Sequence, residues 1–186
     1  MPRDYAALPR TQVRRSDREV TNESWIKDLL LRAPIGMLAT VAGNQPFLNS
    51  NLFVYNESEH AIYTHTARVG RTRANVEREE QVCFSVYEMG RLLPAETAFS
   101  FSVEYASVVV FGTASCVSDK QQAIAALHLL VQKYAPHLQL GQDYRGVVPE
   151  ELSRTSVYRI AIEEWSGKKK EAPADFPGAY TYKPPA

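Results

Sequence analysis

The residues best suited to chemistry gather in one stretch, residues 62–80, which reads IYTHTARVGRTRANVEREE. An apolar strand pattern ends there in His-Thr and gives way to a helix rich in arginine. A phosphate group binds backbone N–H groups at a helix start, hydroxyl groups, and guanidinium groups that contact two oxygens. The stretch offers all three kinds of donor, in Thr64, Thr66, Gly70, Thr72, Arg68, Arg71, Arg73 and Asn75. These residues predict a site for a ligand that carries phosphate.

The same stretch also fits a second interpretation, a solvent-exposed basic helix that binds no ligand. Glu77, Glu79 and Glu80 follow Arg71 and Arg73 closely enough to pair with them on a helix. The pattern alone leaves both interpretations open.

His65 is the candidate catalytic residue, because an imidazole titrates near neutral pH and can donate a proton or orient a substrate. The alternative is a strand-end histidine bonded to the backbone. The histidines and cysteines show no metal-binding spacing, so no metal site is expected. Cys83 and Cys116 lie in apolar runs and are expected to be buried thiols, with a disulfide or redox pair as the alternative.

Size and composition narrow the class of protein. The chain of 186 residues fits one domain, and 45% apolar residues allow a real core. Lys and Arg number 21, as do Asp and Glu, which argues against a general nucleic-acid binder. No apolar run reaches the roughly 20 residues of a membrane span, and residues 1–20 lack the apolar block of a secretory signal. We expect a soluble, cytoplasmic protein that binds neither nucleic acid nor membrane.

Two helices are predicted besides the short one after Gly70. The first starts at Thr21 or Asn22, either of which can cap it, and ends before Pro34. The second follows Ser118, which with Gln121 resembles a capping box. Its apolar residues at helical spacing are Ile124, Leu127, Val131 and Tyr134.

Period-two alternation predicts strands over residues 35–42, 47–56, 61–66, 81–89, 99–117 and 156–165. Residues 90–98 are expected to form a loop. The long strand is expected to bend near residues 104–107 and at Gly112. About six strands in meander order favour a mainly β, α+β fold, a small antiparallel barrel with flanking helices.

The order of several short blocks resembles a known family. GMLAT, QPFLNSNLFVY, IYTHTARVGRTRANV, QVCFSV, YASVVVFGTA and IEEWSGK follow one another as in the FMN-binding split-barrel proteins. That family includes the pyridoxamine 5'-phosphate oxidase-like proteins and, closer still, the nitroimidazole-resistance (Nim-type) branch. The resemblance covers residues of about 20 to 170. It implies a six-stranded antiparallel split β-barrel, a homodimer, and one FMN per site at the dimer interface.

Composition predicts an arm at each end of the chain. Residues 1–20 are polar, with two prolines and a cluster of arginines, and are expected to be an N-terminal arm, whereas residues 168–186 are rich in Pro, Gly and Lys and are expected to be a C-terminal arm. Residues 21–167 would then be the FMN-binding domain that the resemblance implies, together with a set of cofactor-binding residues. Gly70, Arg71 and Thr72 would hold the FMN phosphate. The other residues carried over to flavin contact are Leu38, Ala39, Thr40, Asn49, Asn51, His65, Thr66, Tyr105, Ser107, Trp165 and Lys168, with Tyr105 and Ser107 reaching the flavin of the partner subunit.

Two departures from the family pattern matter. Many relatives carry Lys at the position of Thr72, so one phosphate charge is lost here unless Arg73 compensates. The tail AYTYKPPA lacks the Arg-x-His type of pattern that pyridoxamine phosphate oxidases use for substrate phosphate. The tail therefore argues against vitamin B6 oxidation.

An FMN-dependent oxidoreductase acting on a small molecule is the leading expectation, with a nitro-aromatic compound as one candidate acceptor. No G-x-G-x-x-G is present, so NAD(P)H as electron donor would bind only transiently over the flavin. The alternative is a non-catalytic flavin-, haem- or deazaflavin-binding protein of the same fold. A third hypothesis is single-stranded nucleic acid binding, on aromatics such as Phe47, Phe53, Tyr55 and Phe84.

Overall fold

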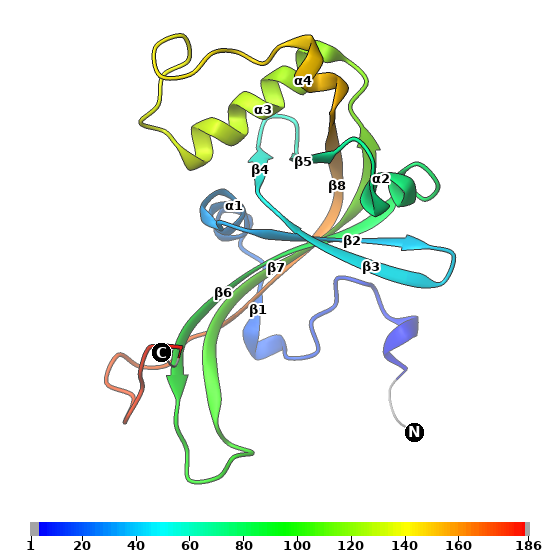
Figure 1. The fold of residues 1–186 in the computed structure, drawn as a ribbon. Coiled ribbons are helices and arrows are strands. Elements are labelled where there is room, and N and C mark those ends of the chain that lie inside the picture. The colour runs from blue at the N-terminus through cyan, green and yellow to red at the C-terminus, as the bar shows by residue number, and fades with distance from the viewer. Residues whose placement is uncertain (1–3, 185–186) are drawn as a thin grey trace.

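The computed structural model describes residues 4–184, whose strands form one curved antiparallel sheet (Figure 1). The eight strands are β1 (Glu19–Val20), β2 (Gly36–Ala42), β3 (Gln45–Asn51), β4 (Phe53–Asn56), β5 (Ala61–Ala67), β6 (Gln81–Leu93), β7 (Ser102–Cys116) and β8 (Thr155–Lys170). They pair in the order β3-β2-β6-β7-β8-β5-β4, and β1 pairs with β8. The expected antiparallel architecture is confirmed, with eight strands in the described residues instead of six.

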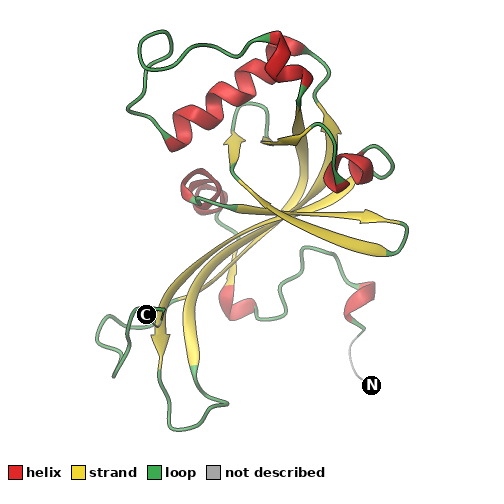
Figure 2. Ribbon diagram, viewed as in Figure 1, coloured by secondary structure: helices red, strands yellow, loops and turns green. Residues whose placement is uncertain are grey.

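Helices flank this sheet (Figure 2). The described residues form α1 (Glu23–Arg32), α2 (Arg71–Val76), α3 (Lys120–Tyr134) and α4 (Pro149–Ser153), with 3-10 turns at Tyr5–Ala7 and Ser16–Arg18. In Figure 2, α3 and α4 lie together over one end of the barrel, and α2 follows the end of β5. None of the helices in residues 4–184 is both long enough and apolar enough to cross a membrane.

Helix α1 forms as the sequence predicts. The side chain of Asn22 accepts a hydrogen bond from the Trp25 N–H at 3.0 Å, which satisfies one free donor of the first turn. Ile26, Leu29 and Leu30 are buried on one face of the helix. Asn22 therefore is the cap that positions α1 on the barrel.

The three longest strands, β6, β7 and β8, form a ribbon that runs along the molecule (Figure 1). Its bends lie where they were predicted. Register shifts occur beside Gly112 and between Met89 and Leu92, opposite Glu104. A Cβ at Gly112 would lie 1.9 Å from the carbonyl oxygen of Ala161, so only glycine fits there.

The barrel interior is filled by side chains that alternate along the strands. Leu38, Phe53, Phe84, Val110 and Tyr158 are completely buried there. A second apolar cluster joins α3 to the outside of the barrel through Ala123, Ala126, Leu130, Val54, Tyr63 and Val157. Because the interior is full, a ligand must bind to the outside of the barrel or in a peripheral cavity.

The strand predicted over residues 47–56 is in fact two strands, β3 and β4, with a break at Leu52. Side chains replace sheet hydrogen bonds around the break. The Thr64 hydroxyl donates to the Leu52 carbonyl at 2.8 Å. The Tyr134 hydroxyl accepts from the Phe53 N–H and donates to the Phe53 carbonyl, each at 3.0 Å. These partners lie far away in sequence, so the local alternation gives no sign of the break.

The predicted loop at residues 90–98 is partly strand, since β6 continues to Leu93. Arg91 pairs with Glu104 across β6 and β7 at 2.7 Å, and the Arg91 guanidinium also donates to carbonyl groups of the C-terminal segment. Leu92 exchanges backbone hydrogen bonds with Tyr180. These contacts extend the hairpin beyond the point where the sequence pattern weakens.

The cap and the apolar face of α3 also differ from the prediction. Asp119, and not Ser118, accepts the capping bond, from the Gln122 N–H at 2.7 Å. The buried residues are Ala123, Ala126 and Leu130, one position away from the predicted stripe. Small side chains are buried because α3 packs closely against β4 and β5.

The sheet includes residues of both terminal segments that were expected to be arms. Glu19 and Val20 pair with Lys168 and Gly167, so part of the expected N-terminal arm belongs to the sheet. Strand β8 continues through Lys170, past the expected boundary at residue 167. Both cysteines are free thiols and are half-buried.

Candidate functional site

The corner between β5 and α2 brings several predicted residues together through hydrogen bonds. The Asn49 side-chain amide on β3 donates to the Thr72 hydroxyl at 3.1 Å. The Asn75 amide donates to the Thr40 hydroxyl at 2.9 Å, and both side chains are buried. These two bonds fix α2 against β2 and β3.

The Thr72 hydroxyl is poised to donate. Its oxygen accepts the hydrogen bond from Asn49, so its own hydrogen can be directed to another acceptor. Thr72 is 4% exposed, and its hydroxyl is therefore held in a largely dry environment. Such a donor suits an anionic oxygen that approaches the start of α2.

The arginines of α2 have different environments. Arg73 pairs with Glu77 at 2.7 Å and donates to the Ser156 hydroxyl at 3.0 Å. The hydrogen bond with Glu77 raises the Arg73 pKa. Arg71 is exposed, lies 6.0 Å from the Phe47 ring centre, and forms no ion pair within residues 4–184. The ion-paired interpretation therefore holds for Arg73, while the Arg71 guanidinium is available to an anion.

Three further predicted residues lie around this corner. Thr66 is hydrogen-bonded to the Tyr158 hydroxyl at 2.9 Å. The Asn51 amide contacts the Asn49 carbonyl at 3.5 Å, the upper limit of a hydrogen bond. Gly70 is exposed, and a Cβ built on it would meet no atom within 4 Å. A ligand can therefore approach the backbone at Gly70 without obstruction.

His65 lies apart from this corner. It follows Thr64 and precedes Thr66 on β5, so its side chain is on the opposite face of the strand. There it lines an apolar cavity beneath α3. His65 is exposed to solvent, but the protein groups around its ring partly desolvate it and lower its pKa, which favours the neutral imidazole at physiological pH. Among residues 4–184 we find no hydrogen bond from its ring, so the interpretation as a backbone-bonded histidine is wrong here.

On β2 the predicted residues divide between two faces. Leu38 is completely buried in the core, so only its backbone could contact a cofactor. Ala39 is half-buried on the other face, next to Leu48 across the strand pair. The Thr40 side chain lies on the same face of β2 as Leu38, and its hydroxyl accepts the hydrogen bond from the Asn75 amide.

Tyr105, Ser107 and Lys168 form a second group, on the long ribbon. Lys168 Nζ lies 5.6 Å from the Tyr105 ring centre, and the Ser107 hydroxyl donates to the Lys168 carbonyl at 3.4 Å. Burial raises the Tyr105 pKa, but hydrogen bonds and charges from Arg18 and Lys168 outweigh it, so the net shift is downward. No hydrogen bond within the described chain joins this group to the α2 corner.

Trp165 packs against the core and does not join either group. Its ring meets His60 edge to face at 4.6 Å, and Tyr55 in the same manner at 6.4 Å. These contacts favour a tryptophan that packs on the core over one that covers a flavin ring.

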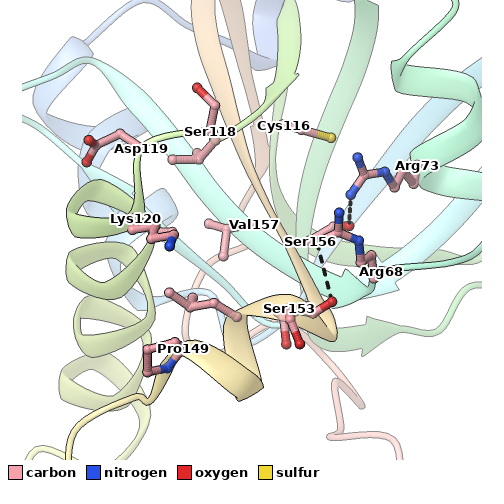
Figure 3. A pocket seen from close by; sticks show the side chains of 14 residues that line it. Arg68, Arg73, Cys116, Ser118, Asp119, Lys120, Pro149, Ser153, Ser156 and Val157 are labelled. Atoms are coloured by element: carbon pink, nitrogen blue, oxygen red, sulfur yellow. Dashed lines mark hydrogen bonds between the residues drawn. The ribbon is translucent and has the colours of Figure 1, made fainter.

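A basic cavity of about 390 Å³ adjoins the α2 corner (Figure 3). Arg68 and Arg73 line one side, and Lys120 lies at the start of α3 (Figure 3). Arg68 and Lys120 form no ion pair in the part of the chain that the structure describes. Ser156 also lines this cavity and connects it to Arg73. No sequence pattern pointed to Ser156, because its pairing with Thr66 joins β5 to β8 across 90 residues.

Solved structures similar to this fold include flavoproteins. Flavocytochrome Anf3 from Azotobacter vinelandii has a TM-score of 0.79 and 24% identity, over 95% of this chain and 87% of that one. The FAD and heme binding protein from Mycobacterium smegmatis has a TM-score of 0.73 and 22% identity, over 83% of this chain and 74% of that one. A candidate 5-nitroimidazole antibiotic resistance protein from Bacteroides thetaiotaomicron has a TM-score of 0.67 and 17% identity, over 81% of this chain and 86% of that one. At these identities the likeness confirms the split-barrel-like fold.

Comparison of the sequence with protein-family models identifies the family. No curated protein matches the chain. The family model described as pyridoxamine 5'-phosphate oxidase matches residues 22–169, which include all the strands from β2 to β7 and nearly all of β8. The chain therefore belongs to the pyridoxamine 5'-phosphate oxidase family.

Proposed function

We propose that this protein is a flavin-dependent oxidoreductase whose cofactor phosphate binds at the α2 corner. The observation that carries the proposal is Arg71, an exposed guanidinium without an ion pair in residues 4–184, next to the buried Thr72 hydroxyl. Asn49 holds that hydroxyl so that it can donate to a phosphate oxygen. Membership of the family and the flavin named in two similar structures support the same assignment.

A bound flavin supplies the electron transfer, so the residues of this chain need only bind, orient and shield it. Arg71 and Thr72 would fix the phosphate end. Ala39, which lies on the outer face of the sheet, would contact the ring system. The proposed electron donor is NAD(P)H, binding transiently, and the proposed acceptor is a small molecule such as a nitro-aromatic compound.

The proposed active form is a homodimer. The outer face of the sheet carries exposed apolar side chains, with Leu48 at 58% exposure and both Tyr87 and Met89 at 47%. Half-buried Val109 lies among them on β7. A patch of this kind marks an interface more often than free surface. Pairing through this face would bring Tyr105, Ser107 and Lys168 of one subunit toward the other subunit.

FMN is the proposed cofactor, and FAD is the alternative that the similar structures raise. FAD carries a second phosphate and an adenosine. The basic cavity at Arg68, Arg73 and Lys120 adjoins the α2 corner and would suit that second phosphate. The mass of the flavin released from purified protein distinguishes the two.

Purified protein should show the visible absorption of a bound flavin. The Arg71→Ala variant should lose most of it during purification, because a charge-assisted hydrogen bond contributes about 1.5–3 kcal/mol. Arg78→Ala is the matched control, since Arg78 is also exposed but lies beyond the end of α2. Equal flavin content in the two variants would mean that the phosphate binds elsewhere. NAD(P)H turnover with a nitro-aromatic acceptor separates an enzyme from a non-catalytic flavin carrier.

A second candidate function is haem binding. The names of two similar structures indicate haem. One is a flavocytochrome, and the other is an FAD and heme binding protein. The observation in this chain that favours it is the apolar cavity beneath α3, which two of the four histidines line. Flavin and haem would occupy different faces of β5, so the two functions are compatible.

A further inference from the structure

The basic cavity between the α2 corner and the start of α3 carries more positive charge than its own acidic group neutralises (Figure 3). Arg68, Arg73 and Lys120 line it, and the carboxylate among the lining residues is that of Asp119. That carboxylate accepts the capping hydrogen bond from the Gln122 N–H at 2.7 Å, so it is engaged within α3. The cavity volume of about 390 Å³ falls within the roughly 300–1,000 Å³ of small-molecule sites. The cavity therefore suits a small anionic ligand.

Lys120 is the cation whose position the fold does not explain. It is the first residue of α3, and its ammonium forms no ion pair and no hydrogen bond within residues 4–184. A positive charge at this end of a helix is unfavourable, because the unbonded N–H groups already give the end a partial positive charge. An anion in the cavity would be attracted both to the ammonium and to the start of this 15-residue helix.

Arg68 faces the cavity from the side opposite α3 (Figure 3). Its N–H donates to the Arg154 carbonyl at 2.9 Å, and its guanidinium donates to the Ser153 carbonyl at 3.3 Å. These partners are neutral, and no ion pair engages Arg68 in the described chain. Arg68 is thus held in place with its charge unpaired, and a guanidinium can bind two oxygens of a phosphate at once.

Arg73 connects this cavity to the proposed flavin site. It follows Thr72 on α2, and its guanidinium donates to the Ser156 hydroxyl in the cavity wall at 3.0 Å. It also pairs with Glu77, but a guanidinium has more N–H donors than these two bonds use. A ligand in the cavity would therefore lie beside the phosphate of a flavin bound at the α2 corner.

The rest of the wall is partly apolar. Val117, Pro149 and Leu152 line the cavity together with the cations. A bare inorganic ion would leave these side chains without a contact. The lining fits a larger molecule that carries an anionic group on an uncharged ring or sugar.

We propose that this cavity binds the 2'-phosphate of NADPH and so selects NADPH over NADH, an inference that rests on the flavin-dependent oxidoreductase proposed above. The two dinucleotides differ only in that phosphate. In other dinucleotide sites an acidic residue binds the ribose 2'-hydroxyl of NAD, whereas an arginine accommodates the 2'-phosphate of NADP. Arg68 and Lys120 provide the second kind of partner. FMN has a single phosphate, assigned to the α2 corner, so it leaves this cavity to the electron donor.

The first part of the test measures binding without turnover. Calorimetric titration of the purified flavin-containing protein should show adenosine 2',5'-bisphosphate binding about 10-fold or more tightly than 5'-AMP, which lacks the 2'-phosphate. Lys120→Ala and Arg68→Ala should each remove most of this preference. Arg154→Ala is the matched control, because Arg154 is exposed and carries the same charge but does not line the cavity.

The second part measures kcat/KM for NADPH and for NADH with a nitro-aromatic acceptor. The ratio of the two values should favour NADPH in the wild-type protein and in Arg154→Ala, and should fall toward one in Lys120→Ala and Arg68→Ala. The flavin content of these variants should stay at the wild-type level, because the flavin phosphate is assigned to Arg71 and Thr72.

The contrary outcomes separate this inference from the function on which it rests. Equal affinity of the wild-type protein for the two nucleotides, or a preference that survives in both variants, would overturn the inference. Flavin-containing protein that uses NADH as well as NADPH would overturn it and leave the proposed function intact. Release of FAD instead of FMN, with the FAD lost in Lys120→Ala, would assign the cavity to the cofactor. Purified protein that holds no flavin and takes up no added FMN would overturn the proposed function and the donor assignment together.

Discussion

At the scale of single residues, the buried Asn75–Thr40 pair shows how polar groups hold the candidate phosphate site. Both side chains are at most 4% exposed, and the amide donates to the hydroxyl at 2.9 Å. The bond ties α2 to β2. The position of Thr72 at the start of the same helix therefore depends on a bond made one turn later.

Asn75→Leu should lower the free energy of unfolding by about 1–3 kcal/mol, because it leaves the Thr40 hydroxyl buried without a partner. Urea unfolding measures the change. The matched experiment is the double variant with Thr40→Val, which removes both polar groups and should cost less than the two single changes added together. Strictly additive losses would show that the two residues do not interact.

The sequence predicted part of this site. The hydroxyl and guanidinium groups around Gly70 are consecutive in the chain, so their shared location follows from local structure. Not all side-chain partners in the site could be predicted in this way. Asn49 bonds to Thr72, and both Glu77 and Ser156 bond to Arg73. Ser156 reaches Arg73 only through the pairing of β5 with β8, which no local pattern encodes.

At the scale of elements, α3 illustrates where sequence patterns fail. Its existence and length follow from composition and spacing, but its rotation about its own axis does not. Ala123 and Ala126 are buried because the strands beneath lie close, and the larger Ile124 is left half-exposed. A hydrophobic pattern predicts that the largest apolar side chains are the buried ones. Where a helix packs closely on strands, only the smallest side chains fit between them.

Lys133 on α3 gives a pH-dependent prediction. Its ammonium lies 3.6 Å from the Phe53 ring centre and donates to the Leu30 carbonyl at 3.3 Å. Burial lowers its pKa from 10.5 to about 8. Between these two values the unfolded chain binds more protons than the folded chain, so Lys133 makes stability rise with pH.

Wild-type protein should therefore gain stability relative to Lys133→Met as the pH is raised from 8 toward 10.5. Chemical unfolding of both proteins at several pH values measures the difference, and the variant serves as the control for all other titrating groups. A difference that stays constant or narrows over this range would show that the ammonium is not buried as described.

At the scale of the whole molecule, the exposed face of the sheet is the feature that a monomer does not explain. Strand β6 presents Tyr87 and Met89 to solvent, and Tyr87 stacks on Tyr105 of β7 at 6.3 Å. Overall architecture could be predicted from the order of strands and from the family resemblance. Which face remains open could not, because it depends on the register of the long ribbon.

Tyr87→Glu should convert a dimer into a monomer, because it places a charge within the proposed interface. Light scattering coupled to size-exclusion chromatography measures the mass. Leu138→Glu is the matched control, an exposed apolar residue at 40% exposure that lies in the connection after α3. The dimer proposal fails if wild-type protein is already monomeric, or if Tyr87→Glu remains dimeric at micromolar concentration.

The central claim is that the α2 corner binds the phosphate of a flavin, and comparison of FMN with riboflavin tests it most directly. The two ligands share the ring system, and only FMN carries phosphate. Fluorescence titration of flavin-free protein should show FMN binding about 10- to 100-fold more tightly than riboflavin, and Arg71→Ala should remove most of that preference. Equal affinity of the wild-type protein for both ligands would contradict the account.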